Sequence, residues 1–126
     1  MKQILVSIII FLLLVGCNDR RLDFEEVSDA MGHAEKIMND NDLVTTSASS
    51  ILDNQFINFR LMVKDRISNE QAKLLIEELV NDIESNLSDI KIFRNKYDFK
   101  FDIKSEKDGE ILYKGRLDQD QIWWQF

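Results

Sequence analysis

Residues 97–104 read YDFKFDIK, an unbroken alternation of large apolar and charged side chains. Because successive side chains of a β-strand point to opposite faces, this pattern predicts a strand with one apolar face and one fully charged face. An alternation this regular is typical of an antiparallel sheet that is buried on one side only. The apolar face must therefore pack against another layer of the fold.

The segments on both sides of this stretch predict further strands. Upstream, residues 55–64 alternate as well, with four apolar side chains on one face: Ile57, Phe59, Leu61 and Val63. Downstream, an Asp-Gly pair at residues 108–109 supplies turn chemistry before a strand in which Gly115 shares a face with Ile111, Tyr113 and Leu117. A second turn at residues 118–121 precedes a last short strand at residues 122–126.

Two segments have the three-four spacing of apolar residues that predicts amphipathic helices. Ser68 and Gln71 form a capping box at the start of the longer one, whose apolar stripe is Ala72, Leu75, Ile76, Leu79, Val80, Ile83 and Leu87. The other begins at Phe24, ends at residues 39–42, and carries Val27, Met31, Ala34 and Met38 on one stripe. Residues 43–54 are rich in Ser, Thr and Ala, and we expect a loop there that holds at most a short strand.

These elements together predict an α+β domain built as a two-layer sandwich. The long helix packs on an antiparallel-rich sheet of about four strands, and the N-terminal amphipathic helix is added to this pair. If the strand at residues 55–64 neighbours the strand that follows the long helix, the connection between them makes the two strands parallel.

The N-terminus has the features of a signal peptide. Lys2 precedes an apolar run at residues 4–15, and twelve helical residues span about 18 Å, well short of the roughly 30 Å hydrocarbon core of a bilayer. The closing residues 14–17, LVGC, resemble the bacterial lipobox. The resemblance implies cleavage between Gly16 and Cys17 and lipidation of Cys17. The alternatives are an ordinary secretory signal beside a chance cysteine and an uncleaved signal anchor.

Removal of residues 1–16 leaves 110 of the 126 residues, which is the usual size of one domain. We expect residues 17–23 to form the lipidated cysteine and a tether, and residues 24–126 to form a single domain on the extracytoplasmic face of the cell membrane. Two acyl chains on Cys17 would hold the protein in the membrane lipid. Since Cys17 is the only cysteine, we expect packing alone to stabilise the domain.

Charge and composition argue against several functional classes. Of the 16 basic residues the signal peptide takes Lys2, so the mature chain has 15 against 23 acidic residues and a formal charge of −8, which disfavours nucleic acid as a partner. His33 is the only histidine and the chain has no free cysteine, so neither a zinc site nor a histidine-activated nucleophile is expected. Carboxylates are abundant, but nothing singles out a catalytic pair. We expect no enzyme activity, no metal and no cofactor.

Strand parity predicts one recognition surface. Trp124 aligns with Ile122 and Phe126 on the inward face of the last strand, so Trp123 projects from the charged face. By the same parity this face carries Phe56, Met62 and Leu112 amid Arg60, Lys100, Lys114 and Arg116. An aromatic and aliphatic cluster rimmed by charge has the composition of a protein interface. The alternative is that the first helix covers this patch.

The lipobox at residues 14–17, the chain length, the acidic charge and the order of helix, strand, helix and strands together resemble one family. It is the small exclusion lipoproteins (YddJ-type) carried by Bacillus integrative and conjugative elements. The resemblance implies a non-enzymatic protein that blocks redundant transfer by acting on the polytopic membrane component of the cognate conjugation channel. The alternative function is an envelope lipoprotein that binds a small ligand or a cell-wall polymer.

The lipobox makes a direct prediction about Cys17. Because the cysteine sulfur accepts the lipid before the signal is cleaved, Cys17→Ala should leave the precursor uncleaved and without acyl label. Metabolic labelling with a fatty acid, together with the gel mobility of the protein in cell extracts, measures both effects. A variant that is acylated and processed normally would contradict the anchor.

Overall fold

The computed structural model describes residues 22–125, so the predicted signal peptide, Cys17 and the tether as far as Arg21 lie outside the described residues. The described elements are, in order, α2 (Phe24–Asn39), β1 (Val44–Leu52), β2 (Phe56–Val63), α3 (Asn69–Ser85), α4 (Ile90–Lys96), β3 (Asp98–Ser105), β4 (Ile111–Asp118) and β5 (Gln121–Gln125). Within residues 22–125, every helix is too short or too polar to cross a membrane.

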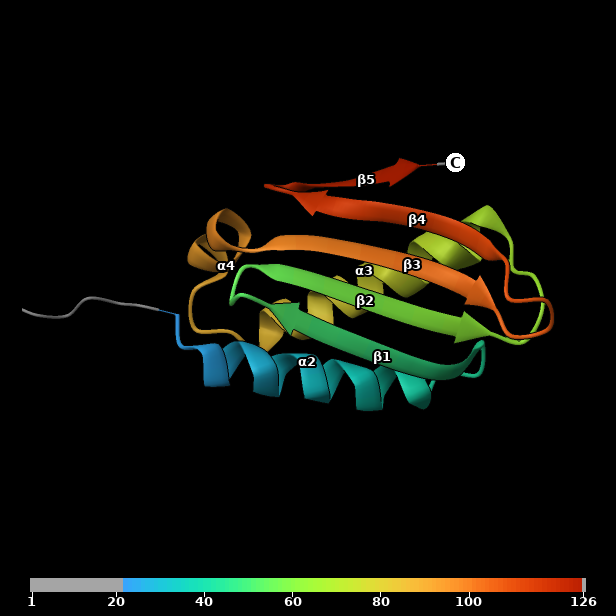
Figure 1. Ribbon diagram of the computed structural model, residues 1–126, viewed down its shortest axis with the longest axis horizontal. Coiled ribbons are helices and arrows are strands. Elements are labelled where there is room, and N and C mark those ends of the chain that lie inside the picture. Colours follow the sequence, from blue (N-terminus) through green and yellow to red (C-terminus); the bar gives the residue numbers. More distant parts are fainter. Residues whose placement is uncertain (1–21, 126) are drawn as a thin grey trace, which may run out of the picture.

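The five strands form one open sheet in the order β1-β2-β3-β4-β5 (Figure 1). Neighbours are antiparallel except β2 and β3, which are parallel and joined through α3 and α4. The predicted α+β class is confirmed, and so is the parallel pairing across the long helix. The sheet has five strands, whereas about four were predicted. The YDFKFDIK stretch forms β3, which is antiparallel to β4, as expected, but parallel to β2.

One face of the sheet supplies half of the core. Ile57 pairs with Phe99, Phe59 with Phe101 and Leu61 with Ile103, and all six side chains are buried. The apolar stripe of α3 packs into the same core with its six buried residues, Ala72, Leu75, Ile76, Leu79, Val80 and Ile83. The capping box predicted at its start is present: the Ser68 hydroxyl accepts from the Gln71 amide, and the Gln71 side chain accepts from the Ser68 amide.

Helix α2 lies beside α3 in the same layer and contacts β1 (Figure 1). Polar side chains join the two helices: His33 Nδ1 lies 3.0 Å from Asp82 Oδ2, and Asn41 Nδ2 donates to Glu78 Oε2 over 3.1 Å. The buried side of α2, which includes Met31 and Met38, therefore faces the core. The alternative in which this helix covers the charged face of the sheet is wrong.

Residues 43–54 were expected to form a loop with at most a short strand, but β1 has nine residues. The prediction fell short because this strand does not alternate between apolar and polar residues. Its helix-side positions include Ser47 and Ser49, which are held by hydrogen bonds to α2. The Ser47 hydroxyl donates to the Glu35 carbonyl oxygen over 3.1 Å, and the Ser49 hydroxyl donates to the Glu35 carboxylate. The helix side of β1 thus makes polar contacts where an ordinary strand would have apolar side chains. A rule based on apolar periodicity therefore predicts a loop here.

Helix α4 was also missed, since no element was predicted between the long helix and residue 97. Asp89 caps it by accepting from the Ile92 amide, and Phe93 buries its side chain in the core. Arg94 then ties it to its neighbours, with Nη2 2.6 Å from Glu84 Oε1 and Nη1 3.1 Å from Asp120 Oδ1. A seven-residue helix is too short to produce a recognisable stripe.

Gly115 allows the C-terminal hairpin to pack on the core. It pairs with Phe101 on one side and with Trp124 on the other. A Cβ built at this position would lie 2.6 Å from Cζ of Phe101 and would overlap the backbone carbonyl oxygen of Trp123. The close approach of β5 therefore depends on a residue without a side chain.

We predict that Gly115→Ala destabilises the domain by about 2 kcal/mol or more, because the added methyl group must displace backbone as well as a ring. Gly32→Ala is the matched control: Gly32 lies inside α2 with no atom near the added methyl, so we expect a gain of about 0.5 to 1 kcal/mol. Urea unfolding followed by circular dichroism measures both. Equal stabilities for the two variants would contradict the packing described.

Candidate functional site

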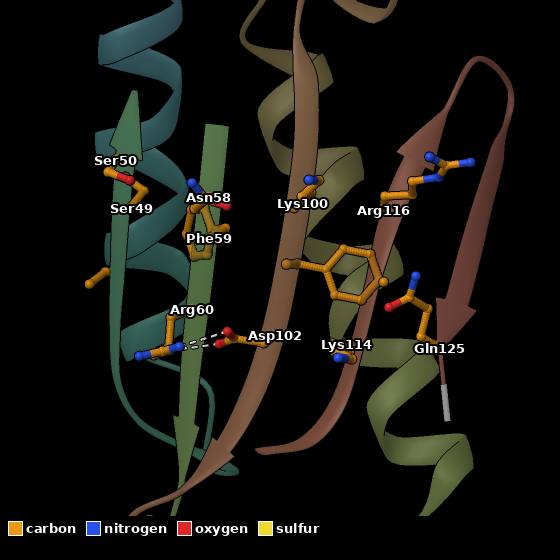
Figure 2. A pocket seen from close by; sticks show the side chains of 13 residues that line it. Ser49, Ser50, Asn58, Phe59, Arg60, Lys100, Asp102, Lys114, Arg116 and Gln125 are labelled. Atoms are coloured by element: carbon orange, nitrogen blue, oxygen red, sulfur yellow. Dashed lines mark hydrogen bonds and ion pairs between the residues drawn. The ribbon is translucent and has the colours of Figure 1, made fainter. Parts of the chain in front are cut away.

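The face of the sheet turned away from α2 and α3 is here called the open face, and nearly all side chains at its centre are exposed. Figure 2 draws side chains of this face. Strand pairing orders its centre into two rows of side chains that cross all five strands. The first row is Ser50, Asn58, Lys100, Arg116 and Trp123, and the second row is Ala48, Arg60, Asp102, Lys114 and Gln125. This face carries the fully charged side of the YDFKFDIK stretch.

A shallow hollow of about 660 Å³ lies over these two rows. Ser50, Asn58, Lys100 and Arg116 line it from the first row, and the whole second row lines it as well. Ala48 and Ser50, which are small, line it on the edge strand β1. The charged side chains of its wall are mostly cations: Arg60, Lys100, Lys114 and Arg116, against Asp102.

Two charges of the second row neutralise each other. Arg60 Nε and Nη2 donate to the two carboxylate oxygens of Asp102 over 2.7 and 2.8 Å, the paired arrangement drawn in Figure 2. This hydrogen bonding and, after it, the charge of Asp102 raise the pKa of the Arg60 guanidinium above its ordinary value. Arg60, predicted as a contact residue, is thus held in place on the sheet by a forked pair.

The remaining cations of the two rows are less compensated. Arg116 Nη2 lies 3.7 Å from Asp118 Oδ2, and Lys100 and Lys114 form no ion pair with any residue of the range 22–125. Lys100 and Arg116 stand directly opposite each other on β3 and β4. Like charges in this position destabilise a sheet. The centre of the open face therefore holds an excess of positive charge in an acidic protein.

The structure places the two tryptophans on opposite faces, as strand parity predicts. Trp123 is 53% exposed on the open face, beside Arg116. Trp124 packs edge-on against Phe101 with ring centroids 5.0 Å apart, and lies 6.3 Å from the Tyr113 ring. Both of these rings belong to the sheet, on β3 and β4, and Trp124 is half-buried against the core.

The other predicted contact residues are dispersed. Phe56 is exposed at the start of β2, one step from the first row, whereas Met62 is half-buried near the far end of the same strand. Leu112 is half-buried against the core, next to a shift in the pairing of β3 with β4. Of the predicted set, the structure therefore brings only Trp123, Arg116 and Arg60 into the two central rows.

Several residues of the hollow were not predicted. Ala48 and Ser50 belong to the missed strand β1, and the pairing of Asp102 with Arg60 depends on which strands are neighbours. The available signal was compositional, because Val44, Thr45, Thr46 and Ile51 are β-branched and favour a strand.

His33 lies in the helix layer, where its ring also approaches Asn86, and it takes no part in the open face. Within the described part of the chain, no group of three His, Cys, Asp or Glu side chains could hold a metal ion. Comparison with protein-family models, with curated proteins and with solved structures found no match.

The geometry predicts that the two tryptophans differ in their effect on stability. Trp124→Ala should destabilise the domain by about 3 kcal/mol or more, because it leaves a cavity against Phe101 and Tyr113. Trp123→Ala should change stability by less than about 1 kcal/mol, because the ring is exposed. Thermal and urea unfolding of both variants measure this. An equal loss of stability would show that Trp123 is covered.

Proposed function

We propose that this chain is a non-enzymatic lipoprotein that is anchored through Cys17 on the extracytoplasmic face of the cell membrane and binds a protein partner with its open face. One observation carries the proposal: Trp123 and the cations of the two central rows stay uncovered although the helices bury the opposite face. Tryptophan and arginine are the residues that most often dominate binding energy at interfaces. A wide, shallow hollow suits another protein surface better than an enclosed small molecule.

The position of the tether supports a partner in the same membrane. Leu22 is buried in the core, and five residue steps from Cys17 to Leu22 span at most about 18 Å. A lipid on Cys17 would therefore keep the domain close to the bilayer. The start of α2 lies at the same end of the domain as α4 and the β1–β2 turn, so this end would face the lipid (Figure 1).

The partner we propose is the polytopic membrane component of a conjugation channel, and the function is exclusion, meaning that the protein blocks redundant transfer into a cell that already carries the element. This assignment follows the resemblance to YddJ-type exclusion lipoproteins. Exclusion of this kind requires an anchor, a rigid domain and an interface, but no catalytic group.

A second candidate function is the binding of an anionic cell-wall polymer. The cationic hollow of about 660 Å³ favours it, since Lys100, Lys114 and Arg116 would attract phosphate groups. The exposed indole of Trp123 favours the protein partner instead, because a phosphate polymer offers it little apolar surface.

A mating assay tests exclusion. Recipient cells that express the protein should receive the cognate element less often than cells without it, and Trp123→Ala should abolish most of this inhibition, because an interface hot spot is worth about 2 kcal/mol or more. Leu74→Ala is the matched control, since Leu74 is 66% exposed on α3 in the helix layer. Immunoblots of membranes confirm equal amounts of each variant. Full inhibition by Trp123→Ala, or equal loss with Leu74→Ala, would contradict the proposal.

A further inference from the structure

We infer that the two central rows of the open face bind an acidic segment of the partner, a short run of carboxylates flanked by apolar side chains. The inference rests on the proposed function, because it specifies the chemistry of the surface that the open face recognises. Charge complementarity carries it: the formal charge of the chain is −7, yet its uncovered sheet face gathers cations at the centre.

The arrangement of Lys100, Arg116 and Lys114 is the first argument. Lys100 pairs with Arg116 across β3 and β4, and Lys114 lies two residues from Arg116 on the same face of β4. Asp102, which is already paired with Arg60, lies opposite Lys114 on β3. Paired strands are about 4.8 Å apart and successive residues on one face are about 6.6 Å apart, so the three cations form a compact triangle. Their mutual repulsion costs stability in the free protein. Bound carboxylates would relieve this repulsion.

Arg60 differs from these three cations, because its charge is paired within the sheet. Arg60 has a forked partner in Asp102 on the neighbouring strand. The corresponding position opposite Lys100 on β2 is Asn58, which is neutral. Arg116 has only Asp118 at 3.7 Å, so the planar edge of its guanidinium remains available to a carboxylate.

The surroundings of the triangle favour a polypeptide over a long polyanion. Trp123 ends the first row beside Arg116, and Phe56 is 39% exposed at the start of β2, so apolar contacts lie on both sides of the cations. Two carboxylates lie next to the first row, on the side toward the start of β3. They are Asp98, which pairs with Phe56, and Asp118, which pairs with Gln121 on β5. These two carboxylates repel a uniform polyanion, but they tolerate a short acidic run with apolar neighbours.

Fluorescence anisotropy with the full-length protein in nonionic detergent tests the inference. The probe is a labelled synthetic peptide of about ten residues in which about three consecutive glutamates are flanked by phenylalanines; the reference peptide has glutamines in place of the glutamates. We expect the acidic peptide to bind at least about tenfold more tightly than the reference, and its affinity to fall between about 50 and 300 mM salt. Equal binding of the two peptides would overturn the inference.

The double variant Lys100→Gln/Lys114→Gln should weaken binding of the acidic peptide at least about fivefold. The matched control is Lys73→Gln/Lys91→Gln, which changes the net charge equally at exposed positions on α3 and α4. It should bind as the unmodified protein does. Thermal unfolding checks that both variants fold. Equal weakening in the two double variants would mean that only net charge matters, and would overturn the site.

Three further outcomes distinguish a failure of this inference from a failure of the proposed function. If poly(glycerol phosphate) binds and the acidic peptide does not, the open face takes a polymer and the inference is overturned. If Lys100→Gln/Lys114→Gln still inhibits mating fully, the partner does not use these cations, so the inference fails while exclusion stands. If the peptide binds to the triangle but no form of the protein inhibits mating, the acidic site stands and exclusion fails.

Discussion

The parallel pairing of β2 with β3 is the constraint on which the rest of the structure depends. This register places Phe59 beside Phe101 and Leu61 beside Ile103 against the helices, which fixes the core. Because side chains alternate with a period of two, the same register places Arg60 beside Asp102 on the other face. A slip of one residue would exchange the two faces, bringing charges into the core and phenylalanines to solvent. Burial of one face therefore determines the charge pattern of the other.

The open face follows from how the helices are distributed. Helix α2 lies beside α3, joined to it by His33 with Asp82 and to β1 by Ser47 with Glu35, so both long helices occupy one side of the sheet. Antiparallel-rich sheets tolerate one solvated face, and here that face concentrates lysine and arginine at its centre. The like charges of Lys100 and Arg116, which lie opposite each other, cost stability, and the proposed recognition surface includes both.

The sequence predicted those elements whose apolar periodicity is complete. The alternation around Phe99 and Phe101, the capping box at Ser68 and the opposite orientations of Trp123 and Trp124 all rest on local geometry, and the structure has them. The full length of strand β1 was not predicted, because hydrogen bonds from serines replace its apolar face. The pairing of Arg60 with Asp102 was not predicted, because the two residues are 42 positions apart in the sequence and only the strand order brings them together. Neighbour relations between distant segments are not encoded in local periodicity.

The central claim is that recognition takes place on the open face and not on the helix layer. Site-specific photocrosslinking in membranes of cells that carry the element tests it most directly, with a photoreactive residue placed at the position of Trp123 or, separately, at that of Leu74. The account predicts a crosslinked adduct with a membrane protein from the Trp123 position and none from the Leu74 position. An adduct from Leu74 alone, or equal adducts from both positions, would contradict it.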